Sequence, residues 1–152
     1  MKKFALTDET IQVGSLVLYR IICTVAFENI NVGQKGGYIE KEDNLSGNAW
    51  VFGDARVSGN AEVSGNALVF GYARVFGDAR VSGNADYIVF KNWWSSGRYF
   101  TWTRSNNMWI VGCFYGTGKE LIKKAYADSE ISGREYERIV KYVEQLKQEG
   151  VL

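Results

Sequence analysis

Valine returns at every sixth position through the middle of the chain. From Gly47 to Ile88 the sequence reads GNAWVF, GDARVS, GNAEVS, GNALVF, GYARVF, GDARVS and GNADYI. Each unit has the form of a short strand and a corner, because valine and the alanine two residues before it face one way, and Gly-Asn or Gly-Asp favours a turn. A six-residue period fits neither an α-helix nor a plain β-strand. Extending the register back to Ile39 places the start of the repeat near Gly37.

The repeat predicts stacked, three-sided coils in which positions eighteen residues apart lie above one another, spaced like the strands of a sheet. The units V-F-G-D-A-R and V-S-G-N-A-E resemble those of the hexapeptide-repeat family of left-handed β-helices, where an aliphatic and a small residue recur in each unit. We therefore predict a mainly β protein in which residues 37–90 form a short left-handed parallel β-helix of about three coils.

The flanking segments are expected to cover the ends of this β-helix, since terminal coils expose strand edges and apolar surface. Residues 1–36 read as strands and predict an N-terminal β cap. Residues 91–152 predict a β-hairpin, formed by 99–104 and 108–115, followed by two helices.

Two capping boxes mark the expected helix starts, Thr117-Gly-Lys-Glu120 and Ser132-Gly-Arg-Glu135. The first helix is expected to bury an apolar face, and the second to carry an apolar stripe that stops near Gly150. The stripe consists of Tyr136, Ile139, Val140, Val143 and Leu146.

Outward positions of the repeat form an apolar ladder that is too large for an isolated monomer to leave in water. We expect it to be buried against another subunit or against the terminal segments of the same chain. The family resemblance implies a homotrimer, and pairing of trimers into hexamers stays open. The expected interface residues are Trp50, Phe52, Leu68, Phe70 and Phe76.

Charge and cysteine content restrict the partners and the compartment. Eighteen basic and seventeen acidic residues give a formal net charge of +1, so there is no overall field that favours duplex nucleic acid or an anionic membrane. The longest apolar stretch, residues 16–27, is interrupted by Arg20 and is too short to cross a bilayer. Cys23 and Cys113 share no metal-type spacing, and they indicate a reducing, cytoplasmic environment.

The chain contains no histidine. Acyltransferases of the hexapeptide-repeat family typically use a histidine as base, and the carbonic anhydrases of that fold bind zinc through histidines. The resemblance therefore predicts no enzyme activity here, and we expect no catalytic residue, metal or cofactor. An atypical acyltransferase that uses a carboxylate such as Asp54 or Asp78 stays an alternative.

Aromatic and arginine side chains alternate after the repeat, a pattern suited to stacking on a base and pairing with a phosphate. For most of these rings, packing of the hairpin onto the repeat is the simpler interpretation. A second pair of arginines, Arg56 and Arg74, stacks on one face of the repeat near a predicted subunit cleft, where salt bridges are the alternative. The expected ligand-binding residues of the aromatic segment are Trp93, Trp94, Arg98, Tyr99, Trp102 and Arg104.

Three further segments, residues 6–10, 36–42 and 112–117, resemble a group of phage- and prophage-type proteins over nearly the whole chain. This resemblance implies action in the host cytoplasm. The resulting hypothesis is a non-catalytic trimer that sequesters a small anionic host ligand, with a nucleotide immune signal as one candidate. The alternatives are an inhibitor of a host protein, a structural assembly protein, or the atypical acyltransferase.

Overall fold

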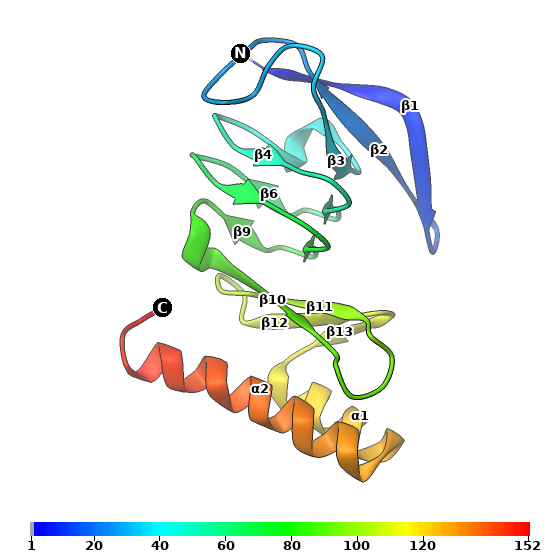
Figure 1. Ribbon diagram of the computed structural model, residues 1–152, viewed down its shortest axis with the longest axis vertical. Helices are drawn as coiled ribbons and strands as arrows, with labels where there is room; N and C mark the ends of the chain where they lie inside the picture. Colours follow the sequence, from blue (N-terminus) through cyan, green and yellow to red (C-terminus); the bar gives the residue numbers. More distant parts are fainter. Residues whose placement is uncertain (1) are drawn as a thin grey trace.

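The computed structural model describes residues 2–152. Its elements lie at three levels along the long axis of the molecule (Figure 1). An N-terminal hairpin lies at one end, the six-residue repeat lies in the middle, and an antiparallel sheet with two helices lies at the other end.

The N-terminal hairpin consists of β1 (Phe4–Val13) and β2 (Leu16–Cys23), paired antiparallel. β2 also pairs antiparallel with β3 (Lys35–Ile39), which continues into the repeat. The predicted boundary after residue 36 therefore falls inside a strand, and hairpin and repeat share one sheet.

The repeat folds into strands of two residues each, and strands eighteen residues apart pair in parallel. Tyr38 pairs with Arg56, Arg56 with Arg74, and Trp50 with Leu68. The predicted eighteen-residue stacking is thus confirmed, and the repeat valines are fully buried. The strands are β4 (Trp50–Val51), β5 (Arg56–Val57), β6 (Glu62–Val63), β7 (Leu68–Val69), β8 (Arg74–Val75) and β9 (Arg80–Val81).

The prediction of a left-handed parallel β-helix over residues 37–90 is nevertheless wrong. Across residues 2–152 the strands form four separate small sheets, and none of them is a closed or continuous parallel solenoid. The two largest are a mixed sheet, in which β3, β5 and β8 extend the antiparallel hairpin, and an antiparallel one; β4–β7 and β6–β9 are isolated pairs. The predicted resemblance to the hexapeptide-repeat family is therefore also wrong. The coarser prediction of a mainly β protein with two helices is confirmed.

Two features of the sequence explain this arrangement. Each two-residue strand is followed by a glycine turn, so consecutive strands along the chain lie in different sheets. At the end of the repeat, the carboxylate of Asp86 accepts hydrogen bonds from the backbone of Ser82 and Gly83, and the chain turns into a 3-10 helix (Asn84–Asp86). A similar short helix (Glu42–Asn44) lies near its start.

The C-terminal sheet is an antiparallel meander of four strands, in the order β10 (Tyr87–Lys91), β11 (Tyr99–Thr103), β12 (Met108–Val111) and β13 (Phe114–Gly116). The predicted hairpin corresponds to β11 and β12 and is confirmed, whereas β10 and β13 were not predicted. The boundary predicted after residue 90 falls inside β10.

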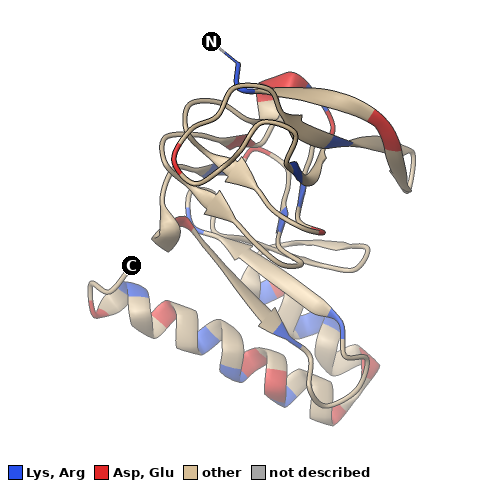
Figure 2. Cartoon of the chain, turned by 45° about the horizontal axis from the view of Figure 1, so that its top comes forward, with Lys and Arg blue, Asp and Glu red and all other residues tan. Residues whose placement is uncertain are grey.

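Two helices, α1 (Gly118–Asp128) and α2 (Glu130–Gln148), cover this sheet and form a second core with it. Thr117 caps α1 in the predicted capping box. The box predicted at Ser132 is wrong, because Ser129 caps α2 and Ser132 lies in its first turn. Figure 2 shows acidic and basic residues alternating along α2. No helix within the described chain is long and apolar enough to span a membrane.

Glycine turns of the repeat differ in the space around them, which allows a direct test of the stacking. Gly53 and Gly59 both have positive φ, 57° and 67°. A methyl group at Gly59 would lie 3.1 Å from the backbone of Gly77 in the next pass, whereas one at Gly53 would meet nothing within 4 Å. We expect Gly53→Ala to lower the free energy of unfolding by about 1–2 kcal/mol through backbone strain alone, and Gly59→Ala to lower it further. Urea unfolding measures both variants, and an equal loss of the free energy of unfolding in the two would contradict the stacking.

Candidate anion-binding groove

A groove of about 340 Å³ lies where three parts of the chain meet. The turn between β1 and β2 forms one wall, outward side chains of the repeat form the floor, and the β12–β13 turn forms the other wall. We call it the arginine groove, because Arg56 and Arg74 are the charged residues that line it.

The register of the repeat brings these two arginines together. Val57 and Val75 are buried in the core, so the preceding residues Arg56 and Arg74 point outward from paired strands. Neighbouring strands are about 4.8 Å apart. The backbone N–H of Arg74 donates to Oγ1 of Thr101 in β11 (2.9 Å), which attaches this strand to the C-terminal sheet.

A third arginine, Arg98, lies in the loop just before β11. Nη1 of Arg74 donates to the carbonyl oxygen of Gly112 (3.0 Å), while the guanidinium group of Arg98 lies close to the α-carbon of the same glycine. A methyl group at Gly112 would overlap Nη1 of Arg98, and the φ of Gly112, 56°, also favours glycine. The guanidinium groups of Arg74 and Arg98 thus both lie at the Gly112 turn.

No carboxylate neutralises this cluster. Arg56, Arg74 and Arg98 form no ion pair anywhere in residues 2–152, and the residues that line the groove include no Asp or Glu. The pKa of Arg74 is lowered, first by burial and then by the positive charges of Arg56 and Arg98, with Cys113 acting in the opposite direction. A half-buried cation among like charges is a favourable place for an anion.

The remaining walls are apolar. Phe76 packs edge-on against Tyr115, with ring centroids 5.0 Å apart, and Leu16, Leu18 and Ile110 also line the groove. Burial raises the pKa of the Tyr115 hydroxyl, with a smaller contribution from the charge of Asp78. The groove therefore presents positive charge beside aromatic and aliphatic surface.

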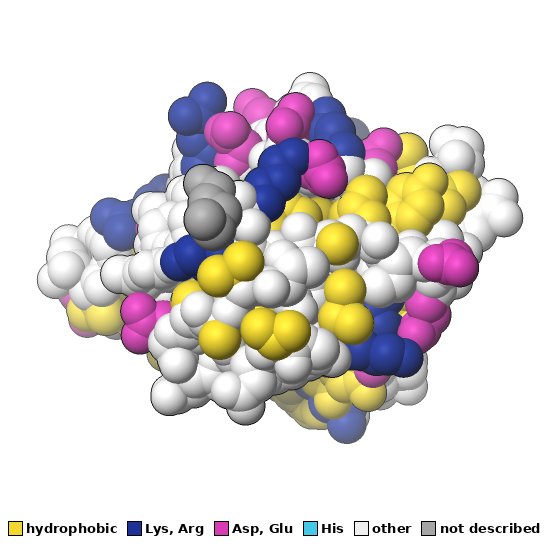
Figure 3. Space-filling view, turned by 90° about the horizontal axis from the view of Figure 1, so that it is seen from above, with side chains coloured by type: hydrophobic (Ala, Val, Ile, Leu, Met, Phe, Trp, Pro, Cys, Tyr) yellow, Lys and Arg dark blue, Asp and Glu magenta, His cyan; other side chains and the backbone are white. Residues whose placement is uncertain are grey.

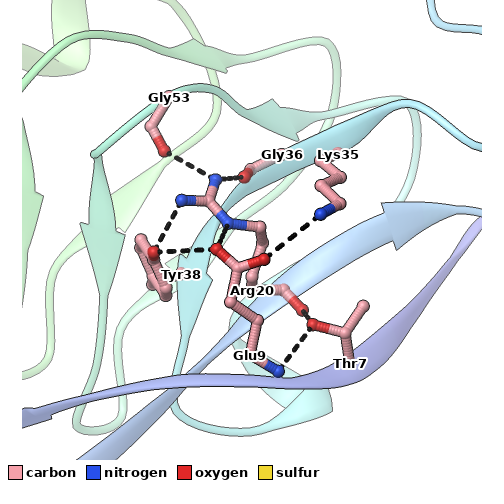
Figure 4. A network of polar contacts seen from close by, with 7 residues as sticks. All are labelled: Thr7, Glu9, Arg20, Lys35, Gly36, Tyr38 and Gly53. Atoms are coloured by element: carbon pink, nitrogen blue, oxygen red, sulfur yellow. Dashed lines mark hydrogen bonds and ion pairs between the residues drawn. The ribbon is translucent and has the colours of Figure 1, made fainter.

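A neighbouring polar network holds the wall in place (Figure 4). Arg20 of β2 donates to a carboxylate oxygen of Glu9, to the carbonyl of Gly36 and to the hydroxyl of Tyr38, each at 2.6 Å. Lys35 also contacts Glu9 (3.3 Å). Hydrogen bonds from Arg20 and then from Lys35 lower the pKa of Glu9. Unlike the groove arginines, Arg20 has acceptors on several sides, so its role is structural.

The aromatic residues predicted to bind a ligand are not gathered into one site. Trp94 packs against Tyr136 of α2, with ring centroids 4.9 Å apart, and its Nε1 donates to Ser132 (3.0 Å). Trp102 is fully buried and donates to Asn107 (2.9 Å). These two rings therefore pack the C-terminal core.

The other members of that set lie on the surface. Trp93 is 64% exposed. Tyr99 stacks on Tyr72 (4.5 Å between centroids), and Arg104 pairs with Asp86 (3.8 Å). Trp93 contacts its neighbour Trp94 edge-on at 4.9 Å. Among predicted ligand residues from distant parts of the chain, Arg56, Arg74 and Arg98 are the ones brought together.

The residues predicted to form the subunit interface also lie in different environments. Trp50 is fully buried and meets Phe27 of the N-terminal segment edge-on at 5.8 Å, so the same chain covers it and no second subunit can reach it. Phe52 and Phe70 stack at 4.5 Å with planes 9° apart, and Phe70 remains half exposed. Phe76 lies in the arginine groove.

Sequence reasoning missed Gly112, Tyr115 and the β1–β2 turn as parts of this site. The predicted strand 108–115 ran through Gly112, and no pattern along the chain showed that a turn there would meet Arg74, which lies 38 residues earlier.

Comparison with known proteins finds no matching family model and no matching curated protein. The resemblance to the phage- and prophage-type group is therefore not supported and carries no argument below. In the part of the chain that the structure describes, no group of three or more His, Cys, Asp or Glu side chains could hold a metal ion.

Replacing an arginine by methionine tests whether that arginine stabilises the fold. Arg74→Met eliminates repulsion and desolvation at the cost of one hydrogen bond, so we expect a free energy of unfolding within about 1 kcal/mol of the wild type, or higher. Arg20→Met leaves several acceptors without a donor and should lower it by about 2 kcal/mol. Urea unfolding of both variants measures the difference, and an equal loss in both would mean that Arg74 is structural.

Proposed function

We propose that this protein binds a small organic anion in the arginine groove and does not transform it chemically. The observation that carries the proposal is that Arg56 and Arg74 line a partly apolar groove without a carboxylate partner, with Arg98 close by at Gly112. The absence of histidine from the sequence supports binding over acid–base catalysis.

Electrostatics favour an occupant that has its own negative charge. Guanidinium groups bind phosphate and carboxylate through paired, charge-assisted hydrogen bonds, and these are stronger where water is excluded. A bound anion would offset the burial and the repulsion that lower the pKa of Arg74. The same groups would repel cations, so the groove selects by charge.

The size of the groove and the chemistry of its walls further restrict the class of ligand. A volume of about 340 Å³ is near the lower end of small-molecule sites, which span about 300–1,000 Å³. Phe76 and Tyr115 offer aromatic surface beside the charges. Our first candidate is therefore a nucleoside monophosphate, with its phosphate on the arginines and its base against the rings. Such a protein would sequester its ligand.

Calorimetric titration with adenosine monophosphate, inorganic phosphate and adenosine tests this function. We expect adenosine monophosphate to bind most tightly, because it supplies both the anion and the ring. Arg56→Gln and Arg74→Gln should each weaken binding about tenfold or more, since a hydrogen bond to a charged group contributes about 1.5–3 kcal/mol.

Arg80→Gln is the matched control, because Arg80 occupies the same position of its repeat unit and pairs with Glu62 (3.5 Å) on a different sheet. Its affinity should equal that of the wild type. Absence of heat with both phosphate compounds would remove the proposal, and equal effects of all three substitutions would show that binding is not specific to the groove.

A second candidate function, self-association, is favoured by one exposed surface. We call it the aromatic face. Phe70 and Tyr72 are 50% and 51% exposed, and the hollow beside them is lined by Tyr87, Ile88, Val89 and Tyr99, with Lys91 over the ring of Tyr99 at its edge. We infer that further copies of the chain cover this face in a homotrimer, because exposed aromatic patches commonly mark interfaces. The face consists of Phe52, Leu68, Phe70, Tyr72 and Tyr99.

Sedimentation equilibrium tests the trimer. We expect a mass three times the chain mass of 17.1 kDa, and a monomer for the double variant Phe70→Ser, Tyr72→Ser. Tyr142→Ser is the control, since Tyr142 is 53% exposed on α2 and outside the aromatic face. A wild-type mass of 17.1 kDa would exclude the trimer but leave the arginine groove intact, because one chain forms that groove.

A further inference from the structure

A small pocket of about 190 Å³ lies at the start of α1, at the end of the molecule away from the N-terminal hairpin (Figure 1). Its lining comes from β11, from β12 and the turn between them, from the first residues of α1 and from α2. We call it the helix pocket. Two kinds of hydrogen-bond donor without a partner meet in it, one from the backbone of α1 and one from a buried side chain of β12.

Backbone N–H groups at the start of α1 are available to a ligand. The N–H of Thr117 donates to Oε1 of Glu120 (2.9 Å), and the N–H of Glu120 donates to Oγ1 of Thr117 (3.2 Å). Between them, the N–H groups of Gly118 and Lys119 have no acceptor among the residues the structure describes. The first N–H groups of a helix attract anions, because they lie outside the helical hydrogen-bond pattern and at the positive end of the helix dipole.

A buried indole supplies an independent donor to the same pocket. Trp109 is 1% exposed, and its Nε1 donates to no acceptor in residues 2–152. Within that range, Nε1 of Trp50 is the one side-chain nitrogen or oxygen that is both unpaired and sealed from solvent, so Nε1 of Trp109 is accessible. A methyl group at Gly118 would lie 3.3 Å from Nε1 of Trp109, which places this indole N–H beside the start of α1. Unpaired N–H groups on buried side chains are rare in folded proteins, and this one is positioned to donate to an acceptor in the pocket.

The charged residues of the helix pocket are not engaged elsewhere. At the opposite end of the molecule, basic and acidic side chains lie close together (Figure 3), and Lys2 pairs there with Glu42. Lys119 and Glu144 both line the helix pocket, and neither forms an ion pair within the described chain. A ligand in the pocket therefore meets one free ammonium group and one free carboxylate.

Size and donor content together restrict the ligand. Asn107 also lines the pocket, and because its Oδ1 accepts from Nε1 of Trp102 (2.9 Å), its Nδ2 is a further donor. A volume of about 190 Å³ is below the range of about 300–1,000 Å³ typical of small-molecule sites. The pocket therefore suits a small ion that accepts several hydrogen bonds and donates one to Glu144.

We propose that the helix pocket binds inorganic phosphate. The phosphate oxygens accept from Nε1 of Trp109 and from the N–H groups of Gly118 and Lys119, and the hydroxyl of the phosphate donates to Glu144. An ionised carboxylate only accepts hydrogen bonds. Glu144 therefore admits phosphate, which retains a proton at neutral pH, and repels sulfate, which retains none. This site is separate from the arginine groove, since the two share no lining residue.

Nuclear magnetic resonance of the indole groups provides a local readout, because the chain has five tryptophans and hence five indole N–H signals. The signal of Trp109 is assigned by its loss in Trp109→Phe. At constant ionic strength, inorganic phosphate should shift this signal and the backbone amide signal of Gly118 in a saturable way. Sulfate should bind at least tenfold more weakly. Glycerol 3-phosphate should also bind at least tenfold more weakly, because a phosphate ester has lost most of its protons at neutral pH; tighter binding of this ester would overturn the assignment to inorganic phosphate.

Charge removal at two exposed residues completes the test without altering the indole. Glu144→Gln should abolish the preference for phosphate over sulfate, because an amide can donate to either ion. Lys119→Gln should weaken phosphate binding about threefold or more, whereas Lys123→Gln, exposed on α1 outside the pocket, should leave it unchanged. Arg74→Gln should also leave it unchanged, which separates this site from the proposed function. An unmoved Trp109 signal at the highest phosphate concentration that keeps the protein dissolved, or equal affinity of the wild type for phosphate and sulfate, would overturn the proposal.

Discussion

Parallel hydrogen bonds between chain passes eighteen residues apart determine where the outward side chains of the repeat lie. The backbone N–H of Arg56 donates to Ala73 (2.9 Å), and that of Ser58 donates to Val75 (3.0 Å). With Val57 and Val75 fixed in the core on one side of these strands, Arg56 and Arg74 emerge side by side on the other. The two cations are neighbours because of the backbone, and their mutual repulsion cannot be relieved by moving the strands apart. The chemistry of the arginine groove depends on this constraint.

The elements on either side turn this pair of charges into a site. Arg20 and Glu9 hold the N-terminal hairpin against the repeat, so its turn forms a wall (Figure 4). On the opposite side, Arg98 lies close to Gly112, and the carbonyl oxygen of Gly112 accepts a hydrogen bond from Arg74. Neither wall supplies a carboxylate. The repeat strands and the two walls therefore hold an excess of positive charge in the groove, as expected of a preformed anion site.

The sequence was informative where a local rule governs structure. The six-residue period predicted the buried valines and the eighteen-residue register, and Thr117-Gly-Lys-Glu120 predicted the start of α1. It failed where contacts between distant segments decide the outcome. The N-terminal hairpin, which pairs with β3 and makes the sheet of β3, β5 and β8 a mixed one, has no signature in the repeat, and the prediction of a parallel β-helix did not foresee it. Arg56 and Arg74 were recognised as a stacked pair, but their meeting with Arg98 depends on Gly112, which lies outside the repeat.

The central claim is that an anion occupies the space between Arg56 and Arg74. Anomalous scattering from crystals soaked in bromide tests this most directly, because it locates anions without any assumption about the natural ligand. The account predicts the strongest bromide peak in the arginine groove, within contact distance of both guanidinium groups. An empty groove, with bromide bound instead beside exposed arginines such as Arg80, would contradict it.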